Sequence, residues 1–107
     1  EEKLLRDTIT NNPGYKLIYF STASVTDSSV KDRPYVAHKL TMEAFIQNNA
    51  DNYLIVRVSN VVGPNGNVTN IMNFLVHAVK DATPINIWAQ AERNFIDKDD
   101  ILFVVKQ

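Results

Sequence analysis

Two short apolar runs constrain the fold more than any other feature of the sequence. Residues 16–21 and residues 53–58 are almost continuously apolar and lack the alternation of polar residues that a half-exposed strand shows. Strands buried on both faces are typical of parallel sheets, whose strands need a crossover connection that is usually a helix. Residues 34–49 lie between the two runs, begin with Pro34 and favour a helix. The sequence therefore predicts a parallel β-α-β arrangement.

Further elements are expected on both sides of this arrangement. Residues 59–67 contain two of the three glycines and are expected to form a loop, residues 85–88 fit a short strand, and residues 93–96 fit another. Helices are expected at residues 1–10, from a cap at Thr69 or Asn70 to about residue 80, and after the cap residues at 97–100. This order predicts an α/β domain with a largely parallel sheet.

The charge balance limits the possible partners. The chain has 11 Lys and Arg residues against 12 Asp and Glu residues, a net charge of −1, and no cluster of basic residues. Such a surface does not attract a nucleic acid backbone or an anionic membrane, and no apolar stretch approaches the roughly 20 residues that span a bilayer. We therefore expect neither nucleic acid nor membrane partners, and a cytoplasmic location.

Metal and disulfide chemistry are not expected. The sequence has no cysteine, which excludes disulfides, thiolate ligands and cysteine nucleophiles. The two histidines, His38 and His77, do not form a zinc motif, so we expect no metal. We expect His38 to be packed inside the protein or between helices.

The two ends of the sequence are unusual. The chain begins with Glu1 instead of Met, and it ends at Gln107 directly after the apolar run of residues 101–105. We therefore expect the 107 residues to be part of a longer protein.

Tyr35 and Lys39 are four residues apart in the expected central helix, so their side chains lie one turn apart on one face. A tyrosine hydroxyl has an ordinary pKa of about 10, and an ammonium within roughly 4 to 6 Å favours the phenolate and lowers that value. Such a pair exchanges a proton with a substrate hydroxyl while a nicotinamide exchanges a hydride. The same spacing is common on solvated helix faces, so the pair alone does not define a site.

Polar side chains also follow both apolar runs. Thr22 and Ser24 come at the end of the first run, and Asn60 follows the second. Ligands bind at the carboxyl ends of strands in open parallel sheets, so these side chains are expected near Tyr35. A hydroxyl group there would orient a substrate carbonyl or alcohol against Tyr35.

Four segments stand in a specific order and spacing. They are Leu17-Ile18-Tyr19-Phe20-Ser21-Thr22-Ala23-Ser24-Val25, then Tyr35-Val36-Ala37-His38-Lys39 with Glu43, then Val56-Arg57-Val58-Ser59-Asn60-Val61-Val62-Gly63-Pro64, and Arg93-Asn94-Phe95-Ile96-Asp97-Lys98-Asp99-Asp100. In these segments the chain resembles the extended short-chain dehydrogenase/reductase superfamily, in particular its NAD-dependent epimerase/dehydratase branch, which acts on nucleotide-activated sugars. The resemblance implies a partial Rossmann-like parallel sheet with flanking helices. Residues 1–80 would be the C-terminal half of the Rossmann-like domain, and residues 81–107 the start of the substrate-binding lobe.

The resemblance implies a catalytic group that also contacts NAD or NADP. Thr22 takes the place of the family's catalytic serine or threonine, and Tyr35 takes that of its acid/base. Lys39 takes the place of the lysine that binds the nicotinamide ribose and tunes the tyrosine, so both Tyr35 and Lys39 are expected to contact the cofactor. Val61 and Val62 are expected to line the nicotinamide pocket.

The resemblance also implies contacts to a nucleotide-sugar substrate. Asn60 falls where the family places a substrate-contacting asparagine, and Arg93 falls where members often place an arginine on the substrate diphosphate, a role that its fork of donors suits. Ser24 is the third expected contact. Ala23 and Ser24 stand where the sugar dehydratases carry acidic residues, which argues against dehydration.

The chain departs from the family in its cofactor half. Gly14, Gly63 and Gly66 are the only glycines, and they do not have the spacing of a dinucleotide-binding turn. The chain is therefore expected to be a fragment that lacks the Gly-rich N-terminal half. It would hold at most the nicotinamide end of the cofactor, and the isolated 107 residues are expected to be inactive.

Two functions fit these residues. The first is an NAD(P)-dependent nucleotide-sugar epimerase or reductase, and the second is a non-catalytic protein of the same fold that binds a dinucleotide or a protein partner as a sensor. The presence of Thr22, Tyr35 and Lys39 together favours the enzyme. The resemblance also implies a homodimer whose contact uses the helices near residues 1–10 and 35–49 of each chain.

Three other side chains have structural interpretations. Glu43 is placed to pair with Lys39 at i, i+4, which would compete with the cofactor role of that lysine. Arg57, at a strand end, is expected to anchor neighbouring loops. Trp88 is expected in the core.

Overall fold

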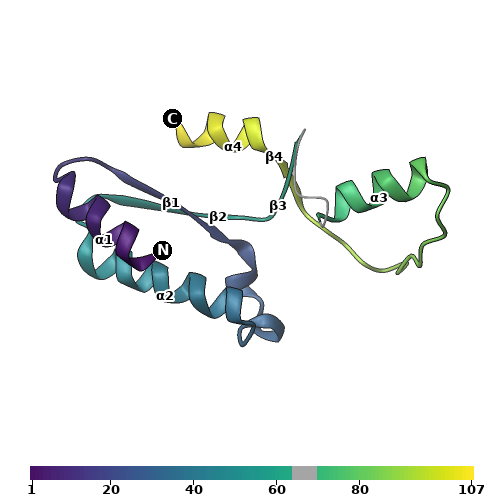
Figure 1. Ribbon diagram of the computed structural model, residues 1–107, viewed down its shortest axis with the longest axis horizontal. Coiled ribbons are helices and arrows are strands. Elements are labelled where there is room, and N and C mark those ends of the chain that lie inside the picture. Colours follow the sequence, from purple (N-terminus) through teal and green to yellow (C-terminus); the bar gives the residue numbers. More distant parts are fainter. Residues whose placement is uncertain (64–69) are drawn as a thin grey trace. The chain divides into compact units, whose positions relative to one another are not determined.

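The computed structural model describes residues 1–63 and 70–107 and consists of helices and short parallel sheets (Figure 1). The chain divides into two compact units, Glu1–Val58 and Ser59–Gln107, and each has its own pair of parallel strands. This arrangement confirms the predicted α/β class and is consistent with part of a Rossmann-like fold.

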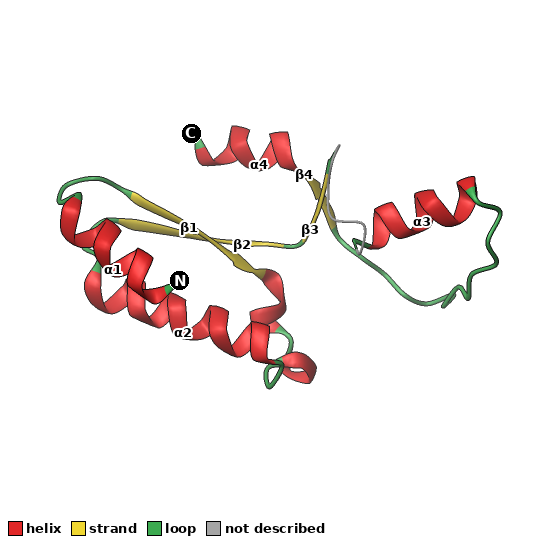
Figure 2. Ribbon diagram, viewed as in Figure 1, coloured by secondary structure: helices red, strands yellow, loops and turns green. Residues whose placement is uncertain are grey.

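The first unit is the predicted β-α-β arrangement (Figure 2). Strand β1 (Leu17–Thr22) pairs in parallel with strand β2 (Tyr53–Val58), and the first residues of the two strands lie opposite each other. Helix α2 (Pro34–Asn49) connects them. Pro34 lies in its first turn, where backbone N–H groups have no acceptor within the helix, so the missing N–H of proline costs no hydrogen bond. Helix α1 (Glu2–Asn11) precedes β1 and packs beside α2.

The core of this unit lies between the two helices and one face of the strands. It consists of Leu5 from α1, Tyr19 from β1, and Met42 and Ile46 from α2. Ile46 is completely buried. The core therefore fixes α2, the helix of Tyr35, on the strand pair.

The other face of β1 is less covered. Side chains alternate along a strand, so Ile18 and Phe20 point away from Tyr19 and are exposed. The expectation of a strand buried on both faces is therefore wrong within this unit. A continuous apolar run predicts that other elements cover both faces of the sheet. In the described part of this unit, helices cover one face.

The segment between β1 and α2 is the expected connection, but it contains two short 3-10 helices, η1 (Ala23–Thr26) and η2 (Ser28–Val30). The side chains of Thr22 and Asp27 cap them, each accepting the backbone N–H of the residue two positions later. Because η1 packs against α2, this connection links the carboxyl end of β1 to that helix.

The second unit contains strand β3 (Asn60–Val62), helix α3 (Ile71–Lys80), strand β4 (Phe95–Asp97) and helix α4 (Lys98–Val105). Strands β3 and β4 pair in parallel. The expected helices at both positions are therefore confirmed, and so is a strand close to residues 93–96.

Both helices of this unit begin at predicted caps. The Asn70 side chain accepts an N–H from the first turn of α3 at 3.1 Å, and Asp97 does the same for α4 at 2.8 Å. Asn70 also donates to the carbonyl of Val61, which ties the start of α3 to β3. The alternative cap, Thr69, lies outside the described residues.

Three expectations for this unit are wrong. The loop expected at residues 59–67 contains β3, because β4 supplies the backbone partners that a strand needs. Residues 85–88 have no regular secondary structure, since alternation makes a strand only where another backbone pairs with it. Trp88 is exposed instead of lying in the core.

Candidate active site

Four of the predicted site residues lie at the carboxyl end of β1 and on η1 and α2, which follow it. Thr22 is the last residue of β1, Ser24 lies in η1, and Tyr35 and Lys39 lie on α2. The Thr22 hydroxyl oxygen accepts the backbone N–H of Ser24 at 3.2 Å. This bond fixes the rotamer of Thr22 and leaves its hydroxyl hydrogen for a further acceptor.

Tyr35 and Lys39 lie one turn apart, as their spacing predicts. Tyr35 is 59% exposed, so its hydroxyl is open to a ligand, whereas the side chain of Lys39 is only 14% exposed. The Lys39 ammonium is 6.0 Å from the centre of the Tyr35 ring. At this distance an ammonium still attracts the electrons of a phenol ring.

The Lys39 ammonium has three acceptors. Its Nζ donates to the Tyr19 hydroxyl at 3.0 Å, to Glu1 Oε1 at 3.2 Å and to the backbone carbonyl of Phe20 at 3.3 Å. It also lies 4.7 Å from the centre of the Tyr19 ring. An ammonium has three N–H donors, so each donor of Lys39 has an acceptor in this structure.

The same contacts set the charges of the cluster. Burial of Lys39 opposes its charge, but hydrogen bonds to Tyr19 and Glu1 outweigh burial and raise its pKa. The hydrogen bond to His38, helped by those from Tyr19 and Lys39, lowers the pKa of Glu1 to about 2. Burial raises the pKa of the Tyr19 phenol. Around neutral pH, Lys39 is therefore a cation, Glu1 an anion and Tyr19 a neutral phenol.

His38 is not packed inside the protein. About half of its side chain is exposed, and its Nε2 lies 2.7 Å from Glu1 Oε2. The expectation that His38 is packed inside is therefore wrong, whereas its contact with Glu1 at the start of α1 agrees with the alternative of a histidine between helices. Sequence reasoning did not find Glu1 or Tyr19, which are 38 and 20 residues from Lys39.

Glu43 pairs with Arg57 and not with Lys39. Arg57 donates from Nε to Glu43 Oε1 at 3.1 Å and from Nη2 to Oε2 at 2.7 Å, a two-pronged geometry. The Glu43 side chain is 4% exposed, and hydrogen bonds from Arg57 lower its pKa despite burial. Ser21 lies beside Glu43, but its buried hydroxyl makes no hydrogen bond of normal geometry. Arg57 thus anchors α2 to the end of β2, where the sequence suggested neighbouring loops.

The Glu43–Arg57 pair predicts a loss of stability in acid. Because Arg57 lowers the folded pKa of Glu43 below its ordinary 4.5, the pair stabilises the fold above pH 4.5, and this contribution is lost as the pH falls through the folded pKa. We expect Glu43→Gln to lower the free energy of unfolding at neutral pH by about 1 to 2 kcal/mol. It would also weaken the dependence of that free energy on acid pH, and the contributions of Glu1 and Asp27, whose pKa values are also lowered, would remain.

Urea unfolding at neutral and acid pH measures both effects. Glu2→Gln is the matched control, because Glu2 forms an exposed pair with Arg6 on α1 that is worth less than about 0.5 kcal/mol. Equal effects of the two substitutions would contradict the assignment of a buried, stabilising carboxylate to Glu43.

The other four predicted site residues lie in the second unit. Asn60, Val61 and Val62 form β3, and Arg93 precedes β4. Asn60 donates from its side chain to the carbonyl of Asn94 at 3.0 Å. Arg93 is exposed and donates to the carbonyl of its neighbour Glu92. The site residues thus fall into two groups, one in each unit.

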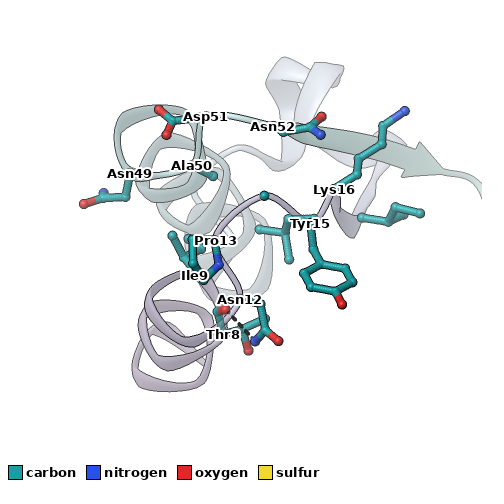
Figure 3. Close-up of a pocket in the computed structure, with 13 residues that line it drawn as sticks. Thr8, Ile9, Asn12, Pro13, Tyr15, Lys16, Asn49, Ala50, Asp51 and Asn52 are labelled. Carbon is teal, nitrogen blue, oxygen red and sulfur yellow. Dashed lines mark hydrogen bonds between the residues drawn. The ribbon is translucent and has the colours of Figure 1, made fainter.

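A cavity of about 510 Å³ lies at the opposite, amino end of the β1–β2 pair (Figure 3). The turn after α1 and the turn after α2 form its walls, with Tyr15 and Asn52 among the lining residues. Asn12 and Asn49 also line it, but each donates to a backbone carbonyl of its own helix. None of the predicted site residues lines this cavity, so it is separate from the cluster around Lys39.

Residues 1–63 and 70–107 contain no group of histidine, aspartate or glutamate side chains that could hold a metal ion. None of the helices in these residues is long and apolar enough to cross a membrane.

The fold and this cluster define an α/β protein with a tyrosine and a lysine at the carboxyl end of a parallel strand. The model of the NAD dependent epimerase/dehydratase family matches residues 5–106. The chain belongs to this family, within the extended short-chain dehydrogenase/reductase superfamily, as the four sequence segments predict. No curated protein and no solved structure matches the chain.

Proposed function

We propose that the chain is the catalytic portion of an NAD(P)-dependent nucleotide-sugar epimerase or reductase. The observation that carries this proposal is the Tyr35–Lys39 pair, in which an exposed phenol stands one helical turn from a largely buried ammonium. Family membership supplies the reaction class, and the pair supplies the acid/base that such a reaction needs.

Tyr35 is the proposed acid/base, which takes a proton from a sugar hydroxyl or returns it to a sugar carbonyl. The Lys39 ammonium, 6.0 Å from the Tyr35 ring, would supply a positive charge beside the reacting group and would hold the cofactor ribose with Tyr35. Val61 and Val62 would line the nicotinamide pocket. The Thr22 hydroxyl would hydrogen-bond the reacting oxygen, since its own oxygen is already fixed by Ser24. When bound, the nicotinamide supplies or accepts the hydride.

The cofactor fits these residues in part. An ammonium and a phenol on one helix face suit two ribose hydroxyls, but the sequence has no Gly-rich turn for the pyrophosphate. We therefore propose that the 107 residues alone are inactive. The division into a Rossmann-like portion at residues 1–80 and a substrate lobe from residue 81 is part of the same proposal.

Substrate recognition is proposed for Ser24, Asn60 and Arg93. The Arg93 guanidinium is exposed and its recorded hydrogen bond is to the adjacent carbonyl, so the donor fork has room for a diphosphate. The homodimer through α1 and α2 and the cytoplasmic location are further parts of the proposal, and both follow from the family.

The test is product analysis with the full-length protein. It would be incubated with NAD(H) or NADP(H) and a panel of UDP-, dTDP- and GDP-sugars, and the products separated and weighed by mass spectrometry. We expect a sugar changed in configuration or reduced at a carbonyl. Cofactor binding without any product from this panel would favour the non-catalytic sensor instead.

A further inference from the structure

We propose that Tyr19 is a positioning residue for Lys39, and that Glu1 is the acceptor that a cofactor hydroxyl replaces. This inference rests on the proposed function and extends it to two residues to which the sequence analysis gave no role. Its basis is how the three donors of the Lys39 ammonium are used.

Tyr19 holds Lys39 from the strand side. Its hydroxyl accepts from Nζ at 3.0 Å and donates to Glu1 Oε1 at 3.0 Å, and its ring lies 4.7 Å from the ammonium. Tyr19 is itself a core residue, packed with Leu5, Met42 and Ile46. A phenol fixed in the core therefore sets where the ammonium stands relative to Tyr35.

The three acceptors of Lys39 differ in how freely they move. The Phe20 carbonyl belongs to the backbone of β1, and the Tyr19 hydroxyl belongs to a buried side chain. Glu1 is a side chain that is 36% exposed. Glu1 is therefore the acceptor with the most freedom to move aside when a ribose hydroxyl needs a donor from Lys39.

The charges around Lys39 agree with this assignment. The groups that face it are Glu1 from α1, Tyr19 from β1 and Tyr35 on its own helix, and His38 faces the other oxygen of Glu1. Glu1 carries a negative charge at neutral pH, so it offsets part of the Lys39 charge. When a neutral hydroxyl replaces Glu1, no carboxylate offsets the positive charge of Lys39 beside Tyr35.

The experiment compares Tyr19→Phe with Tyr53→Phe in the full-length protein. Phenylalanine keeps the ring and the core packing and removes only the hydroxyl. Tyr53, the first residue of β2, is the matched control because Lys39 donates to Glu1, Tyr19 and Phe20 and not to Tyr53. One readout is the NMR signal of the Lys39 ammonium, which is visible when hydrogen bonds slow its exchange with water, and the other is the pH–rate profile.

For Tyr19→Phe we expect the Lys39 signal to broaden away. We also expect kcat at neutral pH to fall about tenfold, with the acid limb of the profile moved up by about one pH unit, the size of effect that one hydrogen bond to a charged group produces. Tyr53→Phe should change neither. An unchanged Lys39 signal overturns the proposal, and so does a lost signal with an unchanged pH profile.

Glu1→Gln tests the proposal that a cofactor hydroxyl replaces Glu1. It also takes the place of the Tyr19→Phe experiment if that variant does not fold. An amide is a weaker acceptor than a carboxylate, so we expect NAD(H) or NADP(H) to bind about threefold more tightly by calorimetry. Unchanged or weaker binding overturns the role of Glu1. If the wild-type protein shows no turnover, the proposed function fails, while the NMR signal still decides whether Tyr19 holds Lys39.

Discussion

Replacement of Tyr35 by phenylalanine should lower the turnover of the full-length protein by about a hundredfold to ten-thousandfold. The substitution removes the hydroxyl that exchanges the proton and leaves the ring in place, and general acid–base catalysis contributes an effect of this size. Because Tyr35 is 59% exposed, the folded structure should not change. Steady-state kinetics and thermal unfolding of the same sample measure both expectations.

Tyr15→Phe is the control for this substitution. Tyr15 is also exposed, but it lines the cavity at the opposite end of the strands. We expect its loss of a hydroxyl to leave turnover within about twofold of wild type, since it is remote from the reacting groups. Normal turnover of Tyr35→Phe would exclude Tyr35 as the acid/base.

Replacement of Leu5 by alanine should lower the free energy of unfolding by about 2 to 5 kcal/mol, the range for large-to-small changes in a packed core. Leu5 is 7% exposed and joins α1 to Tyr19, Met42 and Ile46. The cavity that the substitution leaves would border Tyr19. We therefore expect a destabilised protein, measured by urea unfolding monitored through helical circular dichroism.

The neighbouring Leu4→Ala is the matched control, because it makes the same chemical change in the same helix at a side chain that is 69% exposed. Its expected effect is within about 0.5 kcal/mol of wild type, as for other surface substitutions. If the two variants were equally destabilised, the burial of Leu5 beneath α1 would not describe the folded protein in solution.

Local sequence patterns predicted the main elements correctly. The apolar runs of residues 16–21 and 53–58 form paired parallel strands, and the helix between them begins at Pro34. Asn70 and Asp97 cap helices as their positions predicted. These features depend on residues within a few positions of one another, so their physical causes are visible in a single sequence.

The errors came from contacts between distant residues. Residues 60–62 form a strand because residues 95–97 pair with them, and residues 85–88 lack such a partner. Glu43 satisfied the spacing rule for Lys39, but Arg57, on the next strand, offers it two donors. A helical spacing rule counts only neighbours on the same helix.

Of the candidate site, only the contacts between residues close in sequence could be predicted. Tyr35 and Lys39 share one helix face, which their spacing predicts. Tyr19 and Glu1 contact Lys39 only because β1 and α1 pack beside α2, and no spacing rule links either residue to that lysine. One signal was available, since a tyrosine in an apolar run has to place its hydroxyl against a partner when it is buried.

The most direct test of the proposed chemistry is the absorbance of reduced nicotinamide after rapid mixing of the full-length protein with cofactor and nucleotide sugar. We predict that the absorbance rises when the oxidised cofactor meets a nucleotide sugar with a hydroxyl that can be oxidised, or falls when the reduced cofactor meets a nucleotide keto sugar. We also predict that Tyr35→Phe abolishes the change. Contradiction would be no absorbance change with any sugar of the panel under conditions in which the cofactor is bound, or an equal change in wild type and Tyr35→Phe.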